Sequence, residues 1–155
     1  LERRRDVLVY TSAVLAEDLE VTGPLEAILH AASDARDCDF VVRLADVHPD
    51  GRSLFVAEGF LRARHRYGFD RSELLEPGRV EEFRIRCYPT STVFRSGHRL
   101  RVSIASSSFP RISRNLQSGG DIATDTEADA VVATQTVFHT AIHASHLLLP
   151  IVPAG

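Results

Sequence analysis

Apolar and polar side chains alternate with a period of two along most of the chain, a pattern typical of β-strands with one buried face. In residues 99–106, branched apolar side chains alternate with Arg and Ser, and residues 80–87 show a similar alternation. The runs 25–33 and 40–47 carry apolar residues at both odd and even positions. These two runs are therefore predicted to be central strands that are buried on both faces.

Turn-forming residues divide the chain at strand-sized intervals. The clearest turn is Pro49-Asp50-Gly51, because Asp-Gly readily adopts the positive-φ conformation that joins twisted antiparallel strands. Further turns are predicted at four pairs of residues: Gly23-Pro24, Pro77-Gly78, Ser96-Gly97 and Gly119-Gly120.

Two segments depart from the strand pattern. Residues 70–76 have a helical pattern, which Asp70 would cap and Pro77 would end. Residues 111–130 are polar, rich in Asp and aperiodic, so we expect a long surface connection there. Taken together, the patterns predict an all-β fold: a mostly antiparallel β-sandwich of the Greek-key or jelly-roll type, with one long surface connection.

Composition and charge narrow the class of protein. The 155 residues fit a single domain, 1–155, and 44% apolar with 25% charged residues is ordinary for a globular protein. The net charge of −3 and the scattered arginines argue against nucleic-acid binding, and no apolar run has the length of a membrane span. The chain begins with Leu1 and contains no Met, so we expect a fragment of a larger protein.

The two cysteines, Cys38 and Cys87, each lie within an apolar alternation. This position favours buried free thiols over a disulfide. Free thiols suit a reducing compartment, and we therefore expect a cytoplasmic protein.

Three consecutive serines, Ser106–Ser108, are candidates for a nucleophile. A hydrolase nucleophile usually lies on a G-x-S-x-G turn, whereas these serines run from a predicted strand into Phe109-Pro110. A candidate base, His98, lies at the other end of the same strand, roughly 25 Å away at about 3.3 Å per residue. We therefore interpret the serines as the end of a strand and predict no catalytic residue in this chain.

A histidine-rich segment, HTAIHASH, suggests a metal site. His139 and His143 have the i, i+4 spacing of a zinc-binding helix, and His146 follows closely. However, Thr140 stands where that motif has its catalytic Glu, and the flanking sequences predict strands. We therefore favour structural or hydrogen-bonding histidines, and we expect no metal site and no cofactor.

Two charged groups have simple structural interpretations. The acidic residues Asp121, Asp125, Glu127 and Asp129 lack the spacing of a calcium-binding loop, so a solvated loop is favoured. Residues 59–66 are predicted to be a strand with three arginines on one face. A salt-bridged outer face of the sheet is favoured over a nucleic-acid surface, with arginines 62, 64 and 66 facing acidic candidates at 58, 81 and 82.

Four segments, in this order and spacing, resemble one known family. They are DVLVYTS (6–12) with EDLEVTGPLEAILHAAS (17–33), CDFVVRLADVHPDGRS (38–53) with GFLRARHR (59–66), VFRSGHRLRVSIASSSFPRISRN (93–115) and FHTAIHASHLLLPIVP (138–153). They are similar to the C-terminal domain of the X-Pro dipeptidyl-peptidase and cocaine-esterase-like (CocE/NonD) hydrolases, over residues 6–153. The family often has Asn-Pro-Asn-Thr-Gly where this chain has NLQSG (115–119), which leaves the conformation of that loop open.

The resemblance implies a jelly-roll β-sandwich, galactose-binding-like, attached to an α/β-hydrolase domain that carries the catalytic triad. No motif of this chain matches the segments that bear the triad. We expect a non-catalytic module of a serine hydrolase of esters, amides or X-Pro peptides. It would brace the catalytic domain of the same parent chain, help to shape its pocket and take part in any homo-oligomer. Arg111, Arg114 and Asn115 are candidates for contact with that domain. The alternative is a jelly-roll module that binds carbohydrate or another ligand, although no Trp and 7% aromatic residues offer little surface for stacking on a sugar.

Overall fold

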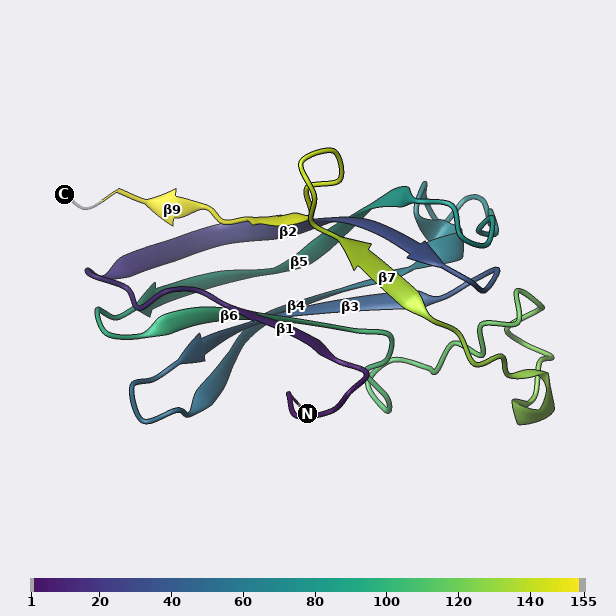
Figure 1. Ribbon diagram of the computed structural model, residues 1–155, viewed down its shortest axis with the longest axis horizontal. Helices are drawn as coiled ribbons and strands as arrows, with labels where there is room; N and C mark the ends of the chain where they lie inside the picture. The colour runs from purple at the N-terminus through teal and green to yellow at the C-terminus, as the bar shows by residue number, and fades with distance from the viewer. Residues whose placement is uncertain (1, 154–155) are drawn as a thin grey trace.

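The computed structural model describes residues 2–153, which form an antiparallel nine-stranded sheet with two 3-10 turns (Figure 1). The strands are β1 (Leu8–Thr11), β2 (Leu19–Ser33), β3 (Asp39–Val47), β4 (Ser53–Arg62), β5 (Glu81–Phe94), β6 (Arg99–Ala105), β7 (Gln135–Phe138), β8 (His146–Leu148) and β9 (Ile151–Val152); the 3-10 turns are η1 (Ala63–His65) and η2 (Glu127–Asp129). The prediction of a mostly antiparallel all-β fold is confirmed.

The sheet curls into two facing layers (Figure 1). One layer has the order β1-β6-β3-β4, and the other contains β5 and β2, with β7, β8 and β9 all paired to β2. Strands β4 and β5 join the layers through the single pair Gly59↔Cys87. A Cβ atom on Gly59 would lie 2.7 Å from Cys87 Sγ and 2.8 Å from the carbonyl oxygen of Arg86. Only glycine therefore permits this close approach, and the resulting arrangement is consistent with a β-sandwich.

The core lies between the layers. The rings of Phe40 in β3 and Phe83 in β5 pack with their centroids 4.8 Å apart, and Leu29, Val42 and Ile85 are buried in the same cluster. The runs 25–33 and 40–47 lie within β2 and β3 and are largely buried at both parities, as predicted. Burial of these branched and aromatic side chains is the main stabilising contribution to the fold.

Most of the predicted turns are confirmed. At the β3–β4 hairpin, the His48 N–H donates to the Arg52 carbonyl at 2.9 Å, and Gly51 has a φ of 88°. The prediction at Gly23-Pro24 is wrong, because β2 continues through these residues with a shift of register between Gly23 and Leu25. The pair forms a bulge, since proline offers no N–H for the ladder.

The helix predicted over residues 70–76 is also wrong, because the segment is irregular. Its backbone donors bond to other parts of the chain: the Glu73 N–H to the Arg64 carbonyl and the Leu75 N–H to the Arg36 carbonyl, both at 2.8 Å. Leu75 is buried in the main core cluster. These tertiary bonds and the burial of Leu75 therefore outweigh a weak local preference for helix.

Both cysteines are free and buried, as predicted. Burial, assisted by Asp37 and Asp39, raises the pKa of the Cys38 thiol from 9.0 to about 12. Burial likewise raises the pKa of the Cys87 thiol to about 11, with smaller contributions from Glu58 and Glu26. Both thiols therefore remain protonated and unreactive at neutral pH. Within residues 2–153, no helix has the length and hydropathy needed to cross a membrane.

Candidate functional site at the end formed by the long connection

Two buried arginine–aspartate pairs lie where β3 begins and β4 ends. Asp39 and Arg62 are direct partners in the β3–β4 register, and the guanidinium donates from Nε to Oδ1 at 2.9 Å and from Nη2 to Oδ2 at 3.0 Å. Arg64 in η1 donates from Nε to Asp37 Oδ2 at 2.7 Å. Asp37 is 0% and Asp39 2% exposed. The Asp39 carboxylate raises the pKa of the Arg62 guanidinium above its ordinary value.

These buried ion pairs hold the long connection between β6 and β7. Asn115 donates from Nδ2 to both aspartate carboxylates, at 2.9 and 2.8 Å. Arg62 also donates to the Ser113 carbonyl at 2.9 Å, and Arg64 donates to the Gly120 carbonyl at 2.8 Å. A long surface connection is present as predicted, and it is anchored to the sheet at three points along its chain.

The predicted arginine face of residues 59–66 needs correction. Strand β4 ends at Arg62, so Arg64 lies in η1 and Arg66 follows it. All three arginines form ion pairs, as predicted, but Arg62 and Arg64 are buried and pair with the buried aspartates described above. Arg66 does pair with Glu81, with Nε and Oε2 3.0 Å apart. The chain turns inward after β4, so Arg62 and Arg64 form buried ion pairs and do not lie on an exposed outer face of the sheet.

The three residues proposed for contact with another domain occupy different environments. Asn115 points into the buried network. Arg111 pairs with Glu58 at 3.0 Å, and Arg114 pairs with Glu127 at 2.8 Å. The Arg111 and Arg114 side chains remain 55% and 51% exposed, so their outer faces are accessible to a partner.

Large apolar side chains are exposed on the loops at this end. Phe69 is 90%, Phe109 71% and Val132 100% exposed. Figure 1 shows the loops after β4 and after β6 at the same end of the molecule. Contacts confirm this placement, because a Cβ on Gly119 would lie 3.5 Å from Leu74 Cδ1. These three apolar side chains are therefore accessible to a partner that would bury them.

The structure places the candidate serines just past the end of β6, where the sequence predicts that the strand ends. Ser106 donates from Oγ to Gln135 Oε1 at 3.1 Å, and the Ser107 hydroxyl accepts the Phe109 N–H at 3.4 Å. His98 precedes β6 and bonds to Asp46 instead. The serine hydroxyls therefore help to join the strand end to β7 and to the connection.

The HTAIHASH segment forms the predicted strand-turn-strand structure. His139 forms an isolated bridge with Ala144, and its ring lies against Tyr10 at 5.9 Å between centroids. His143 packs against the ring of Phe138, whereas His146 bonds through Nδ1 to the Ala144 carbonyl at 2.6 Å. The three imidazoles have separate packing and hydrogen-bonding partners.

The acidic residues of the long connection form hydrogen bonds and an ion pair within it. Asp125 accepts a hydrogen bond from Ser118, and Asp129 accepts from the Thr126 backbone and hydroxyl at 2.8 Å. Asp121 accepts from the Ala123 N–H at 2.9 Å, and Glu127 pairs with Arg114. These contacts agree with the solvated loop predicted from the sequence.

A separate apolar cavity of about 390 Å³ lies between the two layers, near the edges formed by β1, β7 and β8. Leu29, Val42, Ile104 and Leu147 line its apolar wall. Polar atoms come from the rim, where Tyr10, His139, Ser145 and His146 meet it. The cavity suits an apolar group better than a sugar.

Sequence reasoning missed Asp37 and Asp39, although a usable signal was present. The hairpin at Asp50-Gly51 brings the start of β3 next to the end of β4, and the bulge between Leu44 and Ala45 sets the final register, in which Asp39 faces Arg62. Of the acidic candidates considered, Glu81 does pair with Arg66, whereas the partners of Arg62 and Arg64 are Asp39 and Asp37.

Comparisons with known proteins agree with this architecture. Residues 1–148 match the family described as the X-Pro dipeptidyl-peptidase C-terminal non-catalytic domain. The cocaine esterase of Rhodococcus sp. (strain MB1 Bresler) is 40% identical over 149 residues, which cover 96% of this chain and 26% of the esterase.

Two solved structures extend the likeness to the fold. An aminopeptidase from a marine sediment Thaumarchaeota archaeon superposes with a TM-score of 0.94 at 33% identity, over 97% of this chain and 26% of the aminopeptidase. An α-amino acid ester hydrolase superposes with a TM-score of 0.90 at 29% identity, over 96% of this chain and 26% of the hydrolase.

The fold is thus that of an all-β non-catalytic domain of hydrolases. The chain is a member of the X-Pro dipeptidyl-peptidase C-terminal non-catalytic domain family, which also occurs in cocaine-esterase-like enzymes. It spans about a quarter of the length of the relatives that it matches.

Proposed function

We propose that this domain braces the catalytic domain of a serine hydrolase that cleaves esters, amides or X-Pro peptides. The names of the relatives support this substrate class, because they include a cocaine esterase, an aminopeptidase and an α-amino acid ester hydrolase. The nucleophile, base and oxyanion hole would lie in the catalytic domain, where acyl transfer proceeds through an acyl-enzyme.

The exposed apolar side chains of the anchored loops carry this proposal. Phe69, Phe109 and Val132 lie almost wholly in water, although the buried ion pairs hold the connection that bears two of them. Ordering this connection against the sheet costs conformational entropy. A partner that covers the apolar side chains would regain free energy through their burial. The surface fits a catalytic domain, with Arg111 and Arg114 as polar contacts at its margin.

The test uses the full-length hydrolase that contains this domain. Phe109→Asp and Val132→Asp should separate thermal unfolding into two transitions and lower kcat/KM, because the domain no longer docks on the catalytic domain. Leu54→Asp is the matched control, since Leu54 is 46% exposed and lies in β4, outside the anchored loops. The docking role would be refuted if Phe109→Asp and Val132→Asp behave like the control.

The non-catalytic role has a separate test on the 155-residue chain. It should not hydrolyse p-nitrophenyl esters or Xaa-Pro anilides above background, and a fluorophosphonate probe should not label it. Labelling at any of Ser106–Ser108 would overturn this part of the proposal.

The apolar cavity supports a second candidate function, the binding of a small apolar ligand rather than a carbohydrate. Its apolar lining gives a sugar few partners, whereas a volume of about 390 Å³ accommodates a ring or a short alkyl chain. NMR titration with an alkyl ester and with a monosaccharide distinguishes binding of an apolar ligand from binding of a carbohydrate. Shifts at Val102 and Leu147 with the ester alone would support this candidate, and no shifts would refute it.

A further inference from the structure

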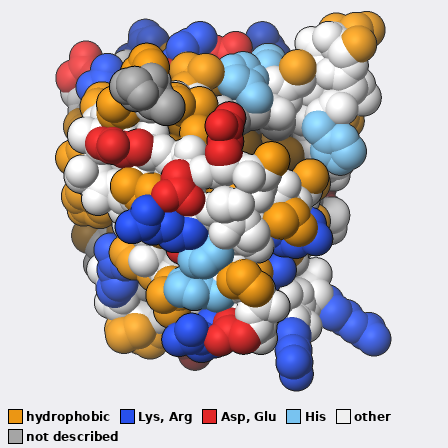
Figure 2. Space-filling model, turned by 90° about the vertical axis from the view of Figure 1, so that its left-hand side faces the viewer, with side chains coloured by type: hydrophobic (Ala, Val, Ile, Leu, Met, Phe, Trp, Pro, Cys, Tyr) orange, Lys and Arg blue, Asp and Glu red, His pale blue; other side chains and the backbone are white. Residues whose placement is uncertain are grey.

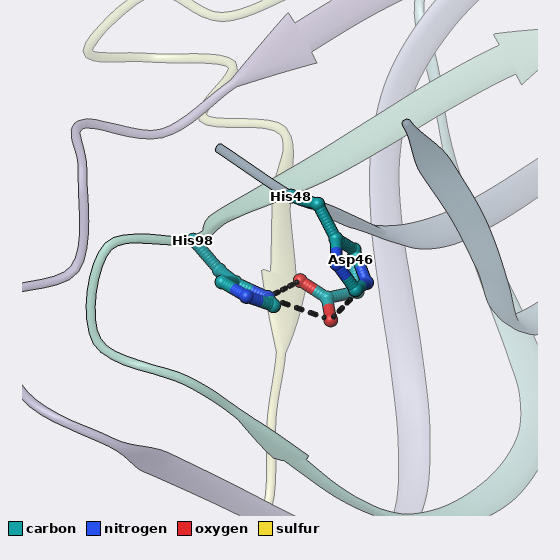
Figure 3. A group of neighbouring side chains, drawn as sticks. All are labelled: Asp46, His48 and His98. Carbon is teal, nitrogen blue, oxygen red and sulfur yellow. Dashed lines mark hydrogen bonds and ion pairs between the residues drawn. The ribbon is translucent and has the colours of Figure 1, made fainter. Parts of the chain in front are cut away.

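Asp46, His48 and His98 form a compact group where the β3–β4 hairpin meets the start of β6 (Figure 3). Figure 1 shows this hairpin at the end of the molecule opposite the long connection. Within residues 2–153, this is the one group of His, Cys, Asp or Glu side chains with three converging ligand atoms, all within 4.8 Å of one another.

The strand register brings these side chains together. β3 pairs with β6 up to Val47↔Arg99, so the next residues outward, His48 and His98, face each other. Asp46 lies two residues before His48 and therefore on the same face of the sheet. The two imidazole rings are 4.2 Å apart between centroids, and Figure 3 shows both pointing toward the Asp46 carboxylate.

The separations between the ligand atoms of this group are close to those around a bound metal ion. His98 Nδ1 lies 2.9 Å from Asp46 Oδ1, whereas His48 Nε2 lies 3.6 Å from Oδ2, which is too far for a hydrogen bond. A tetrahedral zinc ion with bonds of about 2.0–2.1 Å holds its ligand atoms roughly 3.3 Å apart. The two separations from Asp46 bracket this value, and all three ligand atoms lie within 4.8 Å of one another, so rotations of the side chains would bring them to a common ion.

We propose that Asp46, His48 and His98 bind one Zn²⁺ or a chemically similar divalent transition-metal ion. Two imidazoles and a carboxylate form a donor set that such ions prefer. The ion would replace the hydrogen bond between His98 Nδ1 and Asp46, and a proton on that nitrogen would be released to solvent. Three protein ligands leave the remaining coordination position to water.

The group is accessible to an ion from solvent. The side chains of Asp46, His48 and His98 are 12%, 23% and 14% exposed, so the group is partly shielded but open to solvent. Figure 2 shows histidine side chains at the surface on this end of the molecule. Arg52 pairs with Asp50 and Arg95 with Asp18, both at 2.6 Å, whereas Arg99, next to His98, donates to the Ser12 carbonyl at 2.8 Å.

Zinc titration of the 155-residue chain tests the proposal, with affinity measured by competition with a chromophoric chelator. The wild type should bind one Zn²⁺, and His48→Gln should weaken binding more than about tenfold, because even outer-shell changes commonly cost 10–100-fold. His48→Gln keeps the His98–Asp46 bond and should leave the far-ultraviolet circular dichroism spectrum unchanged. His98→Gln is the second variant, and His143→Gln is the matched control on a histidine outside the group.

Two measurements on the wild type do not depend on any variant. Co²⁺ should give the visible bands of a four-coordinate ion, and Zn²⁺ at 100 times its dissociation constant should raise Tm by about 5–10 °C. In NMR, Zn²⁺ should shift the imidazole signals of His48 and His98 and leave His139 unchanged. The proposal is overturned if no stoichiometric Zn²⁺ binds, or if His48→Gln and His143→Gln bind it as tightly as the wild type.

Discussion

Replacing Asp39 by Ala should destabilise the domain by about 3–5 kcal/mol, because it leaves the Arg62 guanidinium buried without its carboxylate. The Arg62 side chain is only 10% exposed. It would lose both bonds to Asp39 and keep only the bond to the Ser113 carbonyl. Asn115 would lose one of its two carboxylate partners in the same change. A typical domain has a total stability of about 5–15 kcal/mol, so the loss is large.

The assay is urea unfolding at pH 7 followed by far-ultraviolet circular dichroism, with the change read as a shift in midpoint at constant m-value. Arg52→Ala is the matched control, since it breaks an Arg–Asp pair whose side chains are 66% and 54% exposed and leaves the turn residue Asp50 in place. Such an exposed pair should contribute far less than the buried one. If Asp39→Ala costs no more than Arg52→Ala, the loss of Asp39 does not leave an uncompensated buried charge at Arg62, and the reasoning is refuted.

Two further predictions concern the junction of the layers and the thiols. Gly59→Ala should lower the free energy of unfolding by about 1–3 kcal/mol in the same urea assay, because the new Cβ would collide with Cys87 and the Arg86 carbonyl. A variant as stable as the wild type would contradict this prediction. The folded-state thiol pKa values are raised from 9.0 to about 12 at Cys38 and about 11 at Cys87, so the contribution of the protonated thiols to stability is fully present below pH 9 and is lost as the pH rises toward these values. The slope should be about 1.4 kcal/mol per pH unit for each thiol, and Cys38→Ala should reduce it; an unchanged slope would argue against the Cys38 contribution.

The strands were predictable from the sequence because their side chains report burial directly. In β6, alternation identified both the strand and its inward face, and the doubly apolar runs identified β2 and β3. Asp50-Gly51 fixed a hairpin, since few other residues adopt that turn readily. Family membership followed from segments in register, and the match to residues 1–148 confirms it.

The misplaced elements depend on contacts that no local pattern contains. Residues 70–76 form no helix, because Leu75 packs into the core and its N–H bonds to Arg36. Gly23-Pro24 forms a bulge within β2 because the strand continues to pair with β5 on both sides of it. The partners of Arg62 and Arg64 lie 23 and 27 residues away, at positions fixed only by the hairpin register. Asp46 and His98 likewise meet only through the pairing of β3 with β6.

The buried ion pairs raise a question of purpose, because apolar residues of similar volume often stabilise a core equally well. In this domain the charged groups also bond to the connection: Arg62 to the Ser113 carbonyl, and Asn115 to both aspartates. An apolar pair would fill the space without providing these bonds. We therefore interpret the network as a device that fixes the position of the long connection rather than as a source of net stability.

The double variant Asp39→Leu/Arg62→Met tests this interpretation. Its free energy of unfolding in urea should lie within about 1–2 kcal/mol of the wild-type value, because no charge is left buried without a partner. Its connection should nevertheless open more often, and trypsin should cleave after Arg111 and Arg114 faster than in the wild type. Cleavage of a locally opened segment reports the population of the open form, independently of global unfolding. Equal cleavage rates at equal stability would show that the connection is held by other contacts and that the network does not fix its position.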